Sequence, residues 1–276
     1  MRVLVYPVNL ETHRESFSLY LGGDLHYGDP NCDVDCWMRL LDAVQEDPAR
    51  VKMLGLMGDY IYSFPKQDRR NWGMKKPQKA DVLGLYTDIR EMLRPVSNRV
   101  IACLAGNHDE DWMQAEGIDF VNWMCAELNI PYAGYECYVR FKVSVKGTNS
   151  KRNVDLVLWH GAGGGRTLGG AFNKARYPID SFRRANVVAM GHMHRLGMAH
   201  EQWTDIVEKT RDVVAEDQYF VLTGGYQKGY SPKESTYISR KMLPPVAIGG
   251  VKLTIQPFRH GSGGGDALDV QFSEVR

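Results

Sequence analysis

The stretch RVIACLAGNHDED, residues 99–111, decides how this chain is interpreted. It begins with an apolar run that stops at Gly106. Asn107, His108 and Asp109 follow this run at once. A short apolar run bounded by a glycine is typical of a buried strand. The stretch therefore predicts a strand whose carboxyl end carries an amide, an imidazole and a carboxylate.

Four other apolar runs have histidine or aspartate at the end of the predicted strand. The runs cover 17–23, 51–58, 154–160 and 186–192, and they end at or lead directly to Asp24 and His26, Asp59, His160, and His192 and His194. The carboxyl ends of parallel strands share one edge of an open α/β sheet, where ligands bind. We therefore expect five segments to bring these polar groups to one place.

Segments with helical periodicity separate several of these strands. Apolar residues recur with helical spacing over 32–47 and over 80–96, which stops at Pro95, and 110–130 predicts a third helix interrupted near Gly117. Further strands are expected at 2–8, 138–145, 219–225 and 251–258. Strands that alternate with helices predict an α/β layered domain, to which the later strands add an antiparallel edge.

Composition narrows the class of protein. No linker divides the 276 residues, which predicts a single domain over 1–276 with a partly mobile, glycine-rich tail at about 260–276. The net charge of +1 gives no overall attraction to nucleic acid or to an anionic membrane. The apolar runs are too short to span a bilayer, so no membrane partner is expected. The five cysteines lack the spacing of a zinc site, and we expect free thiols in a cytoplasmic protein.

The residue types at the strand ends point to metal binding. Imidazole nitrogen, carboxylate oxygen and amide oxygen are ligands for divalent ions such as manganese, and iron, zinc, cobalt and nickel are alternatives. Seven candidate ligands are more than one ion needs, whereas two ions that share a bridging Asp59 would use them all. Two ions about 3.5–4 Å apart clamp a phosphoryl group and activate a water. The sequence therefore predicts two divalent ions and a phosphate-ester substrate.

The order of the motifs resembles a known family. Along the chain they read Asp-x-His, Gly-Asp, Gly-Asn-His-Asp, His-Gly and Gly-His-x-His, from about Leu21 to His194. Each motif alone is weak, but all five in this order, each at the end of an apolar strand, resemble the calcineurin-like metallophosphoesterases. The resemblance implies a four-layer α-β-β-α sandwich of two mixed sheets flanked by helices, with two metal ions at the strand edge.

The resemblance also implies a role for each residue. One ion is held by Asp24, His26, Asp59 and His194, and the other by Asp59, Asn107, His160 and His192. His108 is not a ligand but a proton donor or charge stabiliser over the phosphate, and Asp109 positions it. A carboxylate next to a histidine fixes its tautomer and raises its pKa, as a leaving-group acid requires.

The chain departs from the protein serine/threonine phosphatases that share these motifs. Those proteins carry phosphate-binding arginines in Gly-Asp-x-x-Asp-Arg-Gly and Arg-Gly-Asn-His-Glu. Here residues 58–64 read GDYIYSF, and Ala105 precedes Gly106 where an arginine would stand. The closing Gly-His-x-His is more typical of the phosphodiesterase and nuclease branches, so a protein phosphatase is disfavoured.

Two segments are expected next to the substrate. Residues 161–170, GAGGGRTLGG, follow His160, and we expect Gly164, Gly165 and Arg166 to bind a phosphate in a segment that closes as a lid. Tyr27 follows His26 and is expected to line the same cleft. The loop 64–80 carries six cations around one tryptophan, a combination that binds nucleic acid, although a solvated surface loop explains it equally well.

Taken together, these features predict an enzyme. We expect a dinuclear metal-dependent phosphoesterase that hydrolyses phosphodiester bonds in nucleic acid or nucleotides. A small-molecule phosphomonoesterase is the alternative within the same class. A non-catalytic scaffold with the same fold is the alternative of another class, but such relatives tend to have lost ligands that are all present here.

Overall fold

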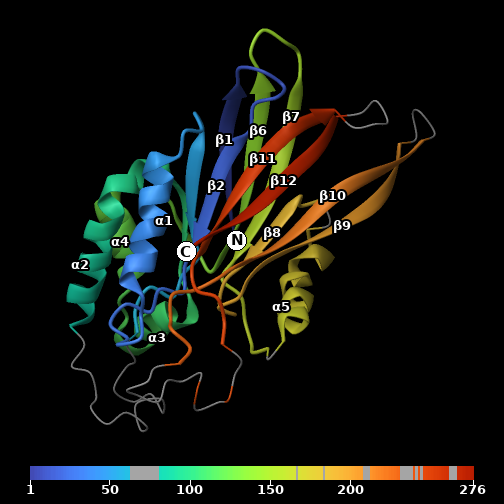
Figure 1. The fold of residues 1–276 in the computed structure, drawn as a ribbon. Coiled ribbons are helices and arrows are strands. Elements are labelled where there is room, and N and C mark those ends of the chain that lie inside the picture. The colour runs from blue at the N-terminus through green and yellow to red at the C-terminus, as the bar shows by residue number, and fades with distance from the viewer. Residues whose placement is uncertain are drawn as a thin grey trace.

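A computed structural model describes residues 1–62, 81–165, 167–182, 184–207, 212–230, 239, 242, 245–260 and 266–276. Within these residues the chain forms two six-stranded sheets and five α-helices (Figure 1). Both sheets contain parallel and antiparallel strand pairs. The predicted α/β class with two mixed sheets is confirmed.

Sheet B contains three of the predicted site strands side by side. Its order is β12-β11-β2-β3-β4-β5, where the strands are β2 (Phe17–Gly22), β3 (Lys52–Leu56), β4 (Val100–Leu104), β5 (Tyr132–Gly134), β11 (Gly250–His260) and β12 (Asp266–Val275). Strands β2, β3, β4 and β5 run parallel, and β11 runs antiparallel to β2. The carboxyl ends of β2, β3 and β4 therefore share one edge, which lies near the start of α3 (Asn107–Glu116) in Figure 1.

Sheet A contributes the other two site strands. Its order is β1-β6-β7-β8-β10-β9, where the strands are β1 (Arg2–Leu10), β6 (Glu136–Val145), β7 (Lys151–Trp159), β8 (Val187–Met190), β10 (Asp212–Thr223) and β9 (Leu196–Val207). Strands β7, β8 and β10 are parallel to one another, so their carboxyl ends also share an edge.

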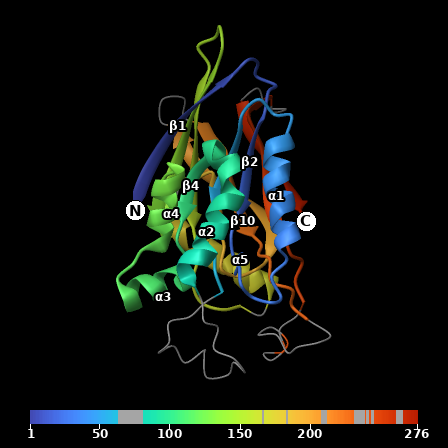
Figure 2. The same ribbon diagram turned by 90° about the vertical axis from the view of Figure 1, so that its left-hand side faces the viewer.

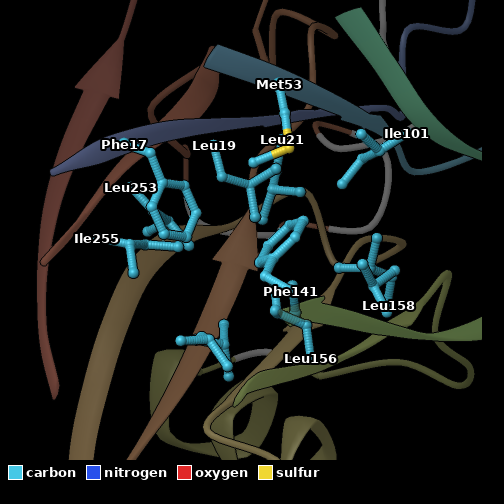
Figure 3. Close-up of a cluster of buried hydrophobic side chains, with 14 of the residues drawn as sticks. Phe17, Leu19, Leu21, Met53, Ile101, Phe141, Leu156, Leu158, Leu253 and Ile255 are labelled. Carbon is cyan, nitrogen blue, oxygen red and sulfur yellow. The ribbon is translucent and has the colours of Figure 1, made fainter. Parts of the chain in front are cut away.

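The two sheets pack face to face around one hydrophobic core. Phe17, Leu19 and Leu21 of β2 point toward Phe141 of β6 and Leu158 of β7 (Figure 3). The rings of Phe17 and Phe141 meet edge to face with centroids 5.3 Å apart. Alternate residues of β6 are buried, as a strand with one face on a core requires.

Helices cover the outer faces of both sheets. A second buried cluster lies between sheet B and the helices α1 (Val34–Glu46), α2 (Val82–Leu93) and α4 (Phe120–Leu128), which face the viewer in Figure 2. A third joins α5 (Leu168–Ala175) to sheet A. The layers therefore run helix, sheet, sheet, helix. No helix among the described residues is long and apolar enough to cross a membrane.

The helices begin and end at residues that favour helix termini. Asp33, Asp81 and Asp119 cap the amino ends of α1, α2 and α4, each accepting a hydrogen bond from a backbone N–H in the first turn. Gly117 ends α3 with a φ of 70°, in the left-handed region that glycine adopts without strain. The predicted interruption near Gly117 is confirmed.

Some elements are absent from the sequence prediction, namely β5, β9, β12 and α5. The sequence predicts that Asp266–Val275 lies within the partly mobile tail, but this segment forms β12 and pairs with β11. Leu268 and Val270 are buried on one face of β12, so the period-two pattern of apolar residues accounts for this strand.

Asp47 ties the carboxyl end of α1 to sheet B. Its Oδ2 accepts a hydrogen bond from the Tyr20 hydroxyl at 2.6 Å and lies 2.8 Å from Lys252 Nζ. We expect Asp47→Ala to lower the free energy of unfolding by about 3 kcal/mol, because it leaves a buried hydroxyl and a largely buried ammonium without an acceptor. Urea unfolding at neutral pH measures the effect, and Asp42→Ala on the exposed face of α1 is the matched control.

The same contact predicts a dependence on pH. Burial raises the pKa of Asp47, but hydrogen bonds from Lys252 and Tyr20 outweigh it and hold that pKa well below its ordinary value. A lowered pKa stabilises the folded state above the unfolded pKa of about 3.9, and this contribution is lost as the pH falls below it. The stability difference between the wild-type protein and Asp47→Ala should therefore shrink near pH 3. An unchanged difference would contradict the assignment.

Candidate metal centre

Five loops from the two sheets meet at one edge of the sandwich. Asp24 and His26 follow β2, Asp59 follows β3, Asn107 and His108 open α3 after β4, His160 follows β7, and His192 and His194 follow β8. Backbone hydrogen bonds join the first two loops, from Asp24 N to the Gly58 oxygen at 2.8 Å and from His26 N to the Asp59 oxygen at 3.1 Å. The predicted convergence of the strand ends is present.

The side chains of these loops form three groups that have the composition of a metal site. The groups are Asp24, His26 and His194; His26, Asp59 and His108; and Asp59, His160 and His192. Within each group the potential ligand atoms lie within 4.8 Å of one another. Because His26 and Asp59 each belong to two groups, the three groups are one continuous centre. Its buried aspartates and histidines can hold metal ions.

Asp59 lies in the middle of this centre. Its Oδ2 is 3.8 Å from His26 Nε2 and 3.4 Å from His160 Nε2. Its Oδ1 accepts a hydrogen bond from the backbone N–H of His108 at 2.9 Å. One carboxylate oxygen is therefore fixed by the backbone, and the other faces imidazoles on two sides.

In Asp24, as in Asp59, one carboxylate oxygen accepts a backbone hydrogen bond and the other faces an imidazole. Its Oδ2 accepts a hydrogen bond from the backbone N–H of His192 at 2.9 Å, and its Oδ1 lies 3.3 Å from His194 Nε2. Asp24 is completely buried, and Asp59 is 2% exposed. Two carboxylates held this far from water require positive charge nearby, which a divalent ion supplies.

The histidines present defined nitrogen atoms to the centre. His160 Nδ1 lies 2.7 Å from the Met57 carbonyl oxygen and His192 Nε2 lies 2.8 Å from the Gly163 carbonyl oxygen. A carbonyl oxygen only accepts, so these nitrogens carry the proton when the ring is neutral. This leaves Nε2 of His160, 3.3 Å from Asn107 Oδ1, and Nδ1 of His192 as ligand atoms. The donor set fits metal ions, since ligating imidazoles usually donate their other N–H to an acceptor.

Backbone strain is concentrated at the centre. Within the described residues, seven non-glycine residues have a positive φ, and five of them are the predicted ligands Asp24, His26, Asp59, His192 and His194, with φ between 49° and 61°. Such conformations cost energy in residues with a Cβ and tend to mark functional sites. These strained conformations lower the stability of the fold, and they occur at the residues that form the centre.

Glycine is required where two of the loops touch. A Cβ at Gly106 would lie 2.1 Å from Asp59 Oδ1, and one at Gly58 would lie 2.6 Å from Gly106 N. The φ of Gly58 is also positive, at 89°. The glycines next to the predicted ligands therefore allow the strand ends to approach closely.

Asp109 holds the loops of the centre together. It is buried, and its Oδ2 accepts hydrogen bonds from Asp59 N and Gly106 N, both at 2.8 Å. Its Oδ1 accepts from Tyr86 Oη at 2.5 Å and from Tyr60 N at 3.3 Å. The expected positioning of His108 by Asp109 stays a prediction, and these contacts would act on it through the backbone of the turn. Asp109 acts on the centre by clamping the backbone that carries Asp59 and the Gly-Asn-His turn.

The electrostatics show how strongly the centre attracts positive charge. Burial raises the pKa of Asp59, but the charges of His160 and His108 outweigh it and hold that pKa well below its ordinary value. Burial lowers the pKa of His160, but Asp59 outweighs it and raises that pKa to about 10. Burial and then the charges of His108 and His194 hold the pKa of His26 well below its ordinary value, which favours the neutral ring that binds metals.

Three of the predicted substrate residues, Tyr27, Gly164 and Gly165, lie within the described residues. The Tyr27 hydroxyl donates to Asp88 Oδ2 on α2 at 3.2 Å, so it does not point to the metal ligands. A Cβ at Gly164 would meet nothing within 4 Å, whereas one at Gly165 would lie 2.7 Å from Met193 Cε. Arg166 and the basic loop 64–80 lie outside the described residues.

Two aromatic side chains that no sequence motif indicates also contact the centre. The Tyr135 ring packs edge-on against His160 with centroids 5.2 Å apart, and its hydroxyl donates to the Gly161 oxygen at 2.7 Å. The Tyr62 ring packs edge-on against His26 with centroids 6.3 Å apart. The only local signal for Tyr135 was its place directly after Gly134, at the end of β5.

No protein-family model matches this chain, and no curated protein matches it. What the centre does must therefore be inferred from its own geometry.

Proposed function

We propose that this chain is a dinuclear metal-dependent phosphoesterase of the calcineurin-like superfamily that hydrolyses phosphodiesters. The observation that carries the proposal is the position of Asp59, with one oxygen 3.8 Å from His26 Nε2 and 3.4 Å from His160 Nε2. A carboxylate shared by two groups of ligands is suited to a bridged pair of ions. The α-β-β-α order of the layers and the order of the motifs support the family.

The ligand assignment follows the two outer groups. Asp24, His26, Asp59 and His194 would hold the first ion, and Asp59, Asn107, His160 and His192 would hold the second. Imidazole, carboxylate and amide ligands suit manganese, with iron, zinc, cobalt and nickel as alternatives. When bound, the two ions would supply Lewis acidity for a phosphoryl group and lower the pKa of a water.

The protein's own residues would orient the substrate and handle protons. Helix α3 begins at Asn107, so the positive end of its dipole is at the centre and favours a phosphoryl anion. The His108 ring lies against His26 with centroids 4.7 Å apart, at the same helix end. We assign His108 to donate a proton to the leaving oxygen. Asp109 keeps the turn that carries it in place.

A substrate panel tests the proposed function. The protein is reconstituted with Mn²⁺ and assayed on bis(p-nitrophenyl) phosphate, p-nitrophenyl phosphate, a cyclic nucleotide, and single- and double-stranded DNA and RNA. We expect diesters to be hydrolysed faster than the monoester, and a chelator to abolish the activity. Hydrolysis of the monoester alone would favour a phosphomonoesterase. No hydrolysis by protein that retains two ions per chain would favour a non-catalytic scaffold.

If nucleic acid is the substrate, the basic loop 64–80 contributes to its binding. Charge reversal at Arg70, Lys75 and Lys76 should weaken oligonucleotide binding, and the slope of log K against log salt should fall by about 0.9 for each lost phosphate contact. Lys142→Glu, at an exposed position on β6, is the control. Unchanged binding in the triple variant would remove the loop from the interface.

A further inference from the structure

The glycine-rich segment 161–165 packs directly on the turn that carries His192. A Cβ at Gly161 would lie 3.1 Å from His192 Cβ, and one at Gly165 would lie 2.7 Å from Met193 Cε. Between them, the Gly163 carbonyl oxygen lies 2.8 Å from His192 Nε2. Side chains at Gly161 and Gly165 would therefore collide with the turn that carries this predicted ligand.

Lys174 holds this segment from its other side. The lysine stands in the last turn of α5, and its Nζ lies 3.3 Å from the Ala162 carbonyl oxygen. A Cβ at Gly163 would lie only 2.1 Å from the same Nζ, so the ammonium group packs against the Gly163 backbone. The lysine thus contacts the backbone on both sides of the 162–163 peptide bond.

Helix α5 gives Lys174 a fixed base. Ala171 and Ala175 are completely buried against sheet A, and Thr167 caps the amino end of the helix through a hydrogen bond from Gly170 N. Gly163, in contrast, has a φ of 78° and no side chain to restrict it. The Lys174 contact therefore restrains Gly163, whose carbonyl oxygen meets His192.

The orientation of that carbonyl decides which nitrogen His192 offers to a metal. A neutral imidazole has one N–H, and the Gly163 oxygen accepts it from Nε2. The lone pair is then on Nδ1, which has no hydrogen bond within the described chain, and His192 belongs to the group with Asp59 and His160. If the Gly163 carbonyl turned away, the proton could move to Nδ1 and block the ligand atom.

We propose that Lys174 is a positioning residue for the second ion. Its ammonium group holds the 162–163 backbone so that the Gly163 carbonyl keeps His192 in the form that presents Nδ1 to Asp59 and His160. The inference rests on the proposed function in that it requires a second ion at this place. It adds a residue that lies in α5, outside all five strand-end motifs.

Stepwise metal binding tests the role of Lys174. Lys174→Met keeps the apolar stem and removes the charge, so Mn²⁺ titration followed by electron paramagnetic resonance should show the second ion bound about 10-fold more weakly, with the first unchanged. Lys174→Arg should restore most of the affinity, because it returns a cationic donor. Unchanged affinity for the second ion in Lys174→Met, or equal weakening of both ions, would overturn the proposal.

Two glycine variants provide a matched pair within the same segment. Gly163→Ala should weaken the second ion as Lys174→Met does, because its Cβ would displace the ammonium group and its φ is positive. Gly164→Ala, one residue further, should leave the affinity unchanged, because its Cβ would meet nothing within 4 Å. Asn173→Ala, at an exposed position on α5, controls for changes in the helix. Equal effects of the two alanines would contradict the specific role of Gly163.

A measurement on metal-free protein separates this inference from the proposed function. Nitrogen-15 NMR spectra report the tautomer of His192, which should be the Nε2–H form in the wild-type protein and in Lys174→Arg, and a mixture in Lys174→Met. A fixed tautomer in all three proteins would overturn the role of Lys174. If the protein bound no Mn²⁺ at all, the proposed function would fail, and the second-ion role of Lys174 would fail with it. The NMR result would still decide whether Lys174 orients His192.

Discussion

Asp59→Asn is expected to remove both metal ions and to lower phosphodiesterase activity by about a thousandfold, equivalent to about 4 kcal/mol of transition-state stabilisation. The substitution replaces one carboxylate oxygen by an amide nitrogen, which cannot ligate a metal. Since Asp59 is the carboxylate between the two groups of ligands, its loss affects both ions. This distinguishes it from the outer ligands, each of which belongs to one ion in the proposed assignment.

The structure indicates that Asn at position 59 would keep the local fold. Asparagine has the same shape as aspartate, and its carbonyl oxygen can still accept the hydrogen bond from His108 N, which is 2.9 Å long in the wild-type protein. The φ of Asp59 is 54°, and asparagine adopts positive φ at least as readily as aspartate. A loss of metal would therefore come from the missing ligand and not from a disrupted loop.

Metal content per chain, measured by inductively coupled plasma mass spectrometry after reconstitution, and the rate on bis(p-nitrophenyl) phosphate check this prediction. Asp42→Asn removes a carboxylate from the exposed face of α1 and should change neither quantity. Retention of two ions by a folded Asp59→Asn protein would show that Asp59 does not bridge them. Retention of one ion would mean that Asp59 belongs to a single site.

His108→Ala is expected to lower activity about 10²- to 10⁴-fold, the usual contribution of a general acid, while metal content stays near two ions per chain. The backbone N–H that orients Asp59 is unaffected by this change. The imidazole of His108 lies next to His26 and belongs to a group of potential ligand atoms with His26 and Asp59. Only the comparison of activity with metal content therefore separates a proton donor from a ligand.

Activity on leaving groups of different acidity provides a second readout for His108. A substrate with an acidic leaving group such as p-nitrophenol needs little protonation, so the variant should lose less activity on it than on an alkyl diester. His200→Ala, at an exposed position on β9, is the control. A fall in metal content in His108→Ala would assign His108 as a ligand instead.

Much of the fold could be predicted from local patterns. Strand β4 was predicted from its apolar run, and the break between α3 and α4 was predicted from Gly117. In contrast, β5 has three residues and β9 has few periodic apolar residues, so neither leaves a clear signal. The period-two pattern of apolar residues in β12 indicates a strand, but the glycines that precede it favour a mobile tail.

The candidate site likewise has residues that local patterns predict and contacts that they do not. The predicted ligands could be found because each follows an apolar run, and a run is visible within a few residues. Asp109 was identified, but its partners were not, because Asp59 N lies 50 positions away in the chain. Lys174 gave no signal, since its contact with the 162–163 backbone depends on how α5 folds back onto sheet A.

The sequence by itself determined the α/β class and the imidazole, carboxylate and amide groups that stand at the ends of strands, because apolar periodicity and glycine act over short distances along the chain. Only the tertiary structure decided that Asp59 lies between two groups of histidines, that Asp109 clamps the loops, and that the Gly163 carbonyl oxygen lies 2.8 Å from His192 Nε2. These relations depend on contacts between segments from different strands and helices. Such contacts arise from the packing of the two sheets and their helices around shared cores, which no local pattern of residues records.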